Sequence, residues 1–239
     1  MKSGAHLKSK LILVLFAFLL LFQSCLLYPK LPFPIGKPKG IYHTVKINQT
    51  LWRICQTYNV NPQEVAELNN IKKTSQIKAG DKIFIPGANK VLYVRPTVIA
   101  KDQSIKKKPH RKIFRETGMF TWPLDGKVIK KYGVYNGIKH DGLNIKARSG
   151  TLIKASSSGK VVFSAYLDGY GNTVIIQHKK NYATVYANNM VNLVKKGNWV
   201  SKRQKIAKVG TSGKKSKIAY LHFQIRRYNQ PRNPLFYLP

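Results

Sequence analysis

The stretch GIKHDGLNI, residues 137–145, decides the fold and the chemistry of the carboxy-terminal half of the chain. His140 and Asn144 are separated by an even number of positions, so an extended strand places both side chains on one face. An aspartate in place of Asn144 would complete H-x-G-x-D, in which a histidine and a carboxylate can share a zinc ion. Asp141 falls on the opposite face and is not expected to replace that ligand. The stretch therefore predicts a metal-site scaffold with one ligand changed.

Short strand-like runs surround this stretch. They are rich in Val, Ile, Tyr and Phe and are separated by Gly, Asn or Ser turns, whereas helical periodicity is scarce. Tyr220 and His222 alternate with Leu221 and Phe223, which predicts one groove-facing and one core-facing side. Residues 118–239 are therefore expected to form a mainly antiparallel β-sheet domain. The runs are KVIKKY, TLIKA, GKVVFSAY, NTVIIQH, YATVYA, KIAKV and LHFQIR.

A smaller unit at residues 41–87 shows a different pattern. Thr50 is a helix N-cap before apolar residues at helical spacing. Asn61 caps a second helix, with Pro62 at its first position. An alternating run opens the unit and a strand at residues 82–86 closes it, which predicts the order βααβ and an α+β chain.

The first residues have the features of an export leader. A lysine-containing start precedes an apolar core at residues 11–22, too short for a comfortable membrane span. Cys25 follows a small residue, so residues 1–25 resemble a bacterial lipoprotein signal in which that cysteine is lipidated. An ordinary cleaved signal or an uncleaved anchor is the alternative. Cys55 is the other cysteine, which allows at most one disulfide, and none if Cys25 carries lipid.

Two connectors and the charge complete the organisation. Residues 26–40 form a Pro- and Gly-rich tether, and residues 88–117 form a basic linker. Lys and Arg number 43 against 8 Asp and Glu, giving a formal net charge of +35. This charge predicts an anionic partner surface. It is spread over the whole chain without a nucleic-acid-binding motif, so envelope polymers or lipid head groups are expected rather than nucleic acid.

The smaller unit resembles a LysM domain over its full length. The resemblance rests on Leu51, Ile54, Tyr58 and Leu68 and on the closing Ile85-Pro86, although NQT at residues 48–50 departs from the usual Gly-Asp-Thr. It implies binding of N-acetylglucosamine-containing glycans, and hence of peptidoglycan. A spacer without a ligand is the alternative. The candidate glycan contacts are Asn48, Gln49, Thr50, Asn69, Asn70 and Ile71.

The larger unit resembles peptidase family M23, the zinc endopeptidases of the LytM or lysostaphin type. TWPLDGKV, GIKHDGLNI, DGYGNTVIIQH, YATVYA and LHFQIR stand in the family's order across residues 119–228. The resemblance implies that His140 and His222 are residual metal-ligand positions, with Asn144 in place of the ligand aspartate. Asn188 and Tyr220 replace the two assisting histidines. No catalytic residue is then intact, and no cofactor is expected, except zinc if the residual site binds metal.

The three changes compound chemically. A zinc hydrolase needs three firm protein ligands and an open position for water. The amide of Asn144 is neutral and a poorer ligand than a carboxylate. Asn188 cannot exchange a proton near neutral pH, and Tyr220, with an ordinary pKa of about 10, is a poor base. The site is therefore expected to lack a proton-transfer group.

A LysM unit followed by a degenerate M23 unit resembles the murein hydrolase activators of the NlpD and EnvC type. The resemblance implies a periplasmic protein, anchored in the membrane by its lipid, that binds peptidoglycan. It would activate a cell-wall amidase during wall remodelling or cell division without hydrolysing the wall itself. Two alternatives stay open: a zinc-dependent M23 endopeptidase with an unusual metal site, and a structural wall-binding lipoprotein.

Overall fold

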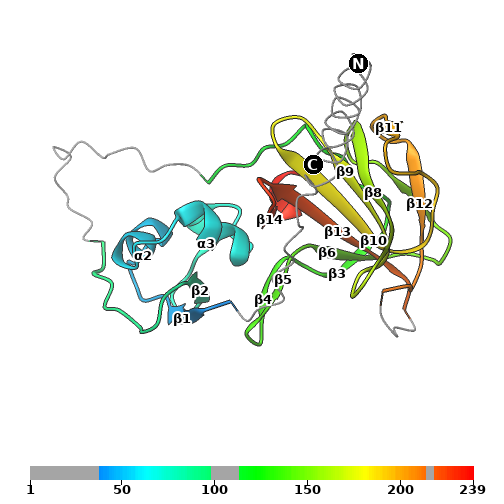
Figure 1. The fold of residues 1–239 in the computed structure, drawn as a ribbon. Coiled ribbons are helices and arrows are strands. Elements are labelled where there is room, and N and C mark those ends of the chain that lie inside the picture. Colours follow the sequence, from blue (N-terminus) through cyan, green and yellow to red (C-terminus); the bar gives the residue numbers. More distant parts are fainter. Residues whose placement is uncertain (1–37, 98–112, 214–217) are drawn as a thin grey trace, which may run out of the picture. The chain divides into compact units, whose positions relative to one another are not determined.

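The computed structural model describes residues 38–97, 113–213 and 218–239 (Figure 1). The predicted leader, its lipidation site Cys25 and most of the predicted tether lie outside these ranges. Across the parts of the chain that are described, no helix combines the length and the apolar character needed to span a membrane.

The amino-terminal unit has the predicted βααβ order, with one short 3-10 turn added. Thr50 accepts a hydrogen bond from the Arg53 amide, and Asn61 accepts from the Gln63 and Glu64 amides, so both predicted caps are present. The two strands pair in antiparallel register, Gly40 opposite Pro86. The elements are β1 (Gly40–Thr44), α2 (Leu51–Thr57), α3 (Pro62–Leu68), η2 (Thr74–Gln76) and β2 (Lys82–Pro86).

Helical spacing explains the core of this unit. Leu51, Ile54 and Cys55 lie on one face of α2 and are fully buried. They pack with Val65 of α3 and with Ile83 of β2 in the same apolar cluster. Cys55 is a free thiol, and burial raises its pKa to about 12, so it behaves as an apolar core residue.

The carboxy-terminal unit is built on one ten-stranded sheet, which confirms the predicted mainly antiparallel fold. Its main order is β11-β8-β9-β10-β13-β6-β3, with β12, β7 and β14 attached at the sides, and β4 and β5 form a separate hairpin (Figure 1). The strands are β3 (Lys127–Lys130), β4 (Gly133–Tyr135), β5 (Ile138–His140), β6 (Leu143–Lys146), β7 (Leu152–Lys154), β8 (Gly159–Leu167), β9 (Gly171–Gln177), β10 (Tyr182–Asn192), β11 (Trp199–Val200), β12 (Lys205–Val209), β13 (Tyr220–Arg227) and β14 (Gln230–Arg232), followed by η3 (Pro234–Phe236).

Strand register brings the predicted site residues together. β13 lies between β10 and β6, and His222 stands directly opposite Asn144 across the β13–β6 pair. Leu143 and Phe223, their neighbours in sequence, point to the other face and are fully buried. The alternation read from the sequence therefore sets which side of the sheet carries chemistry.

The ends of the predicted linker pack against the folded units. Val94 is buried in the amino-terminal core, and its carbonyl accepts from the Gln49 side chain at 2.7 Å. The Phe114 amide donates to the Gln63 side chain at 2.8 Å, and the Tyr182 hydroxyl donates to Glu116. The middle of the linker, residues 98–112, lies outside the described residues.

Candidate functional site

Two histidine side chains converge on the oxygen of Asn144. Asn144 Oδ1 lies 2.8 Å from His222 Nδ1 and 3.1 Å from His140 Nε2. The two imidazole rings stand nearly edge to face, with centroids 5.3 Å apart. Strands β6 and β13 and the end of the β4–β5 hairpin supply one residue each. The structure therefore brings together all three positions that sequence analysis assigned to metal binding.

A backbone carbonyl fixes the tautomer of His140. Its Nδ1 lies 2.9 Å from the Lys131 carbonyl oxygen, which can only accept, so Nδ1 carries the proton. Burial lowers the pKa of His140 below its ordinary value, and the Lys131 hydrogen bond opposes that effect. His140 Nε2 lies 3.1 Å from Asn144 Oδ1, which is also an acceptor, so the neutral ring donates a hydrogen bond to only one of these two oxygens at a time.

The tautomer of His222 is fixed from the other side. The buried Arg226 donates from Nη1 to Gln224 Oε1 at 2.8 Å, which orients the amide of Gln224. The Gln224 amino group consequently faces His222 Nε2 at 2.9 Å and donates to it. His222 Nε2 is therefore the acceptor, and the proton of the neutral ring lies on Nδ1, where it is donated to Asn144 Oδ1.

This arrangement does not fit a zinc hydrolase site. Zinc requires a deprotonated imidazole nitrogen at each histidine ligand and three protein ligands in all. In this chain, the hydrogen bond that Gln224 donates to His222 Nε2 favours the tautomer with its proton on Nδ1, the nitrogen that faces Asn144 Oδ1. Within the described residues, no group of three His, Cys, Asp or Glu side chains is placed to hold a metal ion. Asp141, on the other face, pairs with Lys139 at 3.2 Å.

Asn188 has a structural role in addition to replacing a histidine. It is buried with a left-handed backbone (φ 66°) and donates to the carbonyls of Gly210 and Tyr220 at 3.0 and 2.8 Å. Its oxygen accepts from the Gly213 amide at 2.8 Å. The side chain thus ties the start of β13 to the loop after β12.

Tyr220 begins β13 on the face that carries His222. Burial raises the pKa of Tyr220 above its ordinary value. The phenol therefore stays protonated at neutral pH and does not serve as a base.

The six candidate glycan contacts differ in their burial and in the hydrogen bonds that they already make within the fold. Gln49 is buried and bonds His43, Lys46 and Val94, and Ile71 is buried in the core. Asn69 bonds the Phe84 backbone at both its amide and its carbonyl. Asn48 and Thr50 remain exposed, although Thr50 caps α2 and the Asn48 carbonyl accepts from Thr97. The Asn70 side chain bonds the Tyr132 carbonyl and Asn233.

Sequence reasoning did not identify Gln224 and Arg226 as members of the site. Both lie on β13 at period two from His222, so strand alternation would have placed them on the same face. What alternation does not provide is the direction of the Gln224 amide, because that depends on Arg226 being buried beside it.

Another buried histidine gives a test by pH. His178 donates from Nδ1 to the Ser158 carbonyl at 2.8 Å, and burial lowers its pKa below the ordinary 6.5, an effect that this bond opposes. The unfolded chain therefore binds a proton first as pH falls, so the free energy of unfolding should fall as pH drops below about 6.5. Urea denaturation at pH 7.5, 6.5 and 5.5 measures this slope. His178→Gln should make it shallower, and an unchanged slope would contradict the assignment.

Comparisons with known proteins agree with the two units. The LysM domain family matches residues 43–86, and peptidase family M23 matches residues 138–234. The lipoprotein YgeR of Escherichia coli K12 is 35% identical over 224 residues, covering 85% of this chain and 83% of YgeR. The murein hydrolase activator NlpD of the same strain is 41% identical over 119 residues, covering 49% of this chain but only 31% of NlpD.

A solved structure also matches. The catalytic domain of the antimicrobial peptidase lysostaphin from Staphylococcus simulans is 29% identical, covering 46% of this chain and 90% of that domain, with a TM-score of 0.42.

The fold and the sequence matches together define a protein with a LysM unit and an M23 peptidase-type unit. The chain belongs to the same family as the lipoprotein YgeR, which it matches over 83% of the length of YgeR at 35% identity. The sequence-based resemblance to both domain families is thereby confirmed.

Proposed function

We propose that this chain is an exported, lipid-anchored protein of the periplasm that binds peptidoglycan through its LysM unit and activates a cell-wall amidase. In this proposal the M23 unit does not hydrolyse the wall. It offers its groove to a partner, and Cys25 is the lipidated residue.

One observation carries the proposal. The hydrogen bonds that hold Asn144, His222 and Gln224 keep the peptidase scaffold while withholding the third zinc ligand. Asn188 and Tyr220 supply no base at neutral pH, so neither takes over the role of the assisting histidine that it replaces. A peptidase scaffold with this site is suited to binding rather than to cutting.

Two further observations support the envelope setting. NlpD, to which the chain is 41% identical over 119 residues, is by name a murein hydrolase activator. The net charge of +35 favours long-lived contact with anionic envelope polymers or lipid head groups.

The proposal predicts a result with purified peptidoglycan sacculi. Residues 26–239, the expected mature chain without Cys25, should sediment with sacculi and release no soluble fragments, with or without zinc. Adding periplasmic cell-wall amidases one at a time should identify one whose release of stem peptides increases about tenfold or more in the presence of the chain, as in other allosteric couplings. Mass spectrometry of the soluble fraction measures both results.

Each control separates one alternative. Amidase alone and amidase with a Tyr220→Ala, His222→Ala chain give the unstimulated rate. Zinc-dependent release of peptide-cleaved fragments by the chain alone would make it an endopeptidase. Sedimentation without stimulation of any amidase would leave a structural wall-binding lipoprotein.

A further inference from the structure

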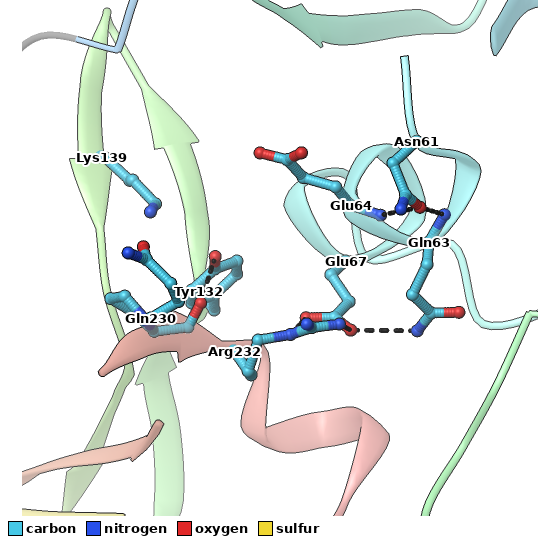
Figure 2. Close-up of a pocket in the computed structure, with 9 residues that line it drawn as sticks. Asn61, Gln63, Glu64, Glu67, Tyr132, Lys139, Gln230 and Arg232 are labelled. Carbon is cyan, nitrogen blue, oxygen red and sulfur yellow. Dashed lines mark hydrogen bonds and ion pairs between the residues drawn. The ribbon is translucent and has the colours of Figure 1, made fainter. Parts of the chain in front are cut away.

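A buried carboxylate joins the LysM unit to the M23 unit. Glu67, near the end of α3, is only 2% exposed. Its oxygens accept from both Nε (2.9 Å) and Nη2 of Arg232 on β14, and from the Asn233 amide at 3.1 Å. Figure 2 shows Arg232 extended toward Glu67. Both residues line a cavity of about 460 Å³. Such a fork of charge-assisted bonds is geometrically specific.

Neighbouring contacts make this a surface rather than a single ion pair. The Asn233 side chain donates to the Glu67 carbonyl at 2.8 Å and to Asn70 Oδ1 at 2.9 Å. Asn70 donates in turn to the Tyr132 carbonyl at 2.9 Å. Leu68 and Phe84 form a small buried cluster with the Tyr132 ring. We call these contacts the Glu67 clamp.

Lys131, Tyr132 and Gly133 connect the Glu67 clamp to the candidate site. The Lys131 carbonyl holds His140, and the Tyr132 carbonyl is held by Asn70. Gly133 pairs with His140 in the hairpin, and a Cβ on Gly133 would lie 2.8 Å from the Leu68 carbonyl oxygen. The LysM unit therefore packs directly on the hairpin that positions His140.

Asn70 belongs to the Glu67 clamp and is also a candidate glycan contact. Both ends of its amide are already bonded within the clamp, to Tyr132 and to Asn233. It is also a candidate glycan contact in the loop after α3. We propose that docking of the LysM unit through the Glu67 clamp and binding of a wall glycan exclude each other, so that glycan binding frees the His140 hairpin. This inference rests on the peptidoglycan-binding part of the proposed function.

The linkage makes the protein a sensor of the wall. Without glycan, the LysM unit is docked and the hairpin is held. With glycan, Asn70 is withdrawn and the hairpin loses the partner of its Tyr132 carbonyl. Because the two states are linked, a change that weakens the clamp without altering the glycan contacts strengthens glycan binding by up to the same factor.

The test compares two substitutions on one helix. Glu67→Gln removes the clamp carboxylate and leaves an amide group facing Arg232. Glu64→Gln makes the same charge change one turn earlier, at an exposed residue, and is the matched control. Arg232→Gln breaks the same ion pair from the M23 unit. Because Arg232 lies outside α3, an effect shared by both variants cannot come from a change in the helix alone.

Three measurements are made on residues 26–239 of each variant. Small-angle X-ray scattering reports the radius of gyration. Titration with the hexamer of N-acetylglucosamine, followed by calorimetry, reports affinity. Imidazole NMR signals of His140 and His222 report the hairpin, and amide NMR spectra confirm that both units remain folded.

We expect Glu67→Gln and Arg232→Gln to enlarge the radius of gyration, to shift the His140 signal, and to bind the hexamer about tenfold more tightly. Glu64→Gln should match the native chain in all three. An unchanged radius in both clamp variants would overturn the docking. A larger radius with unchanged affinity would overturn the exclusion while leaving glycan binding intact. A larger radius without hexamer binding by any variant would overturn the glycan ligand, and the exclusion with it.

Discussion

Replacing Asn188 with alanine should lower the free energy of unfolding by about 3 kcal/mol, because it leaves buried backbone groups without partners. The Asn188 side chain bonds the carbonyls of Gly210 and Tyr220 and the amide of Gly213. Each unsatisfied buried group costs about 1–3 kcal/mol, which water entering the loop partly offsets. The left-handed backbone of Asn188 adds about 1 kcal/mol, since alanine tolerates it less well than asparagine.

Urea denaturation of the two proteins at pH 7.5 measures this loss. Asn136→Ala is the matched control, because Asn136 is exposed and also has a left-handed backbone (φ 49°). The control should lose only the backbone contribution, about 1 kcal/mol. Equal losses in both variants would show that the hydrogen bonds of Asn188 do not contribute to stability.

The same contacts explain why one substitution would not restore a catalyst. Asn188→His would place an imidazole where the loop after β12 and the start of β13 need two donors and an acceptor. A histidine cannot supply all three from the same positions. Position 188 has therefore become part of the fold, and return of the histidine expected from the family would cost stability.

Local rules were sufficient for the elements and for the faces of the strands. Period-two alternation placed His222 on the side of the strand opposite Leu221 and Phe223, and both of these residues are fully buried in the core. The caps Thr50 and Asn61 were readable because N-capping depends only on the next few residues. The expectation that His140 and Asn144 share one extended strand was wrong, because β5 ends at His140 and β6 begins at Leu143. The two side chains meet because of the way the β4–β5 hairpin folds back, which period-two alternation does not predict.

Contacts between distant parts of the chain could not be predicted from the sequence. Glu67 looks like a solvent-exposed helix residue, and its partner Arg232 lies 165 positions away in sequence. No periodicity connects an α3 residue with β14, so sequence analysis treated the two units as separated by a linker. The Asn70 contacts were hidden for the same reason. Gln224 required knowledge of Arg226, whose burial follows from the sheet topology.

The double substitution Asn144→Asp with Gln224→Glu should raise zinc affinity about 100-fold or more, within the range of combined changes in ligands and their supporting groups. The aspartate supplies the missing negative ligand. The glutamate accepts a hydrogen bond from Nε2–H of His222 while it keeps its bond to Arg226. This favours the tautomer in which the Nδ1 lone pair is available to the metal. Asn144→Asp alone should gain less, because Gln224 still donates to His222 Nε2 and keeps the proton on Nδ1.

Calorimetric titration with zinc at pH 7.5 measures this gain, repeated in buffers of different ionisation enthalpy to count released protons. Asn144→Asp with Gln230→Glu is the control for added negative charge, since Gln230 is exposed at the start of β14. If the two double variants bind zinc equally, the orientation of Gln224 has no part in excluding metal. If the Gln224 variant gains more affinity than the control, then the hydrogen bonds that Gln224 and Arg226 make behind His222 contribute to withholding zinc from this site. The direction of the Gln224 amide would then act together with residue 144 in setting the affinity of this scaffold for zinc.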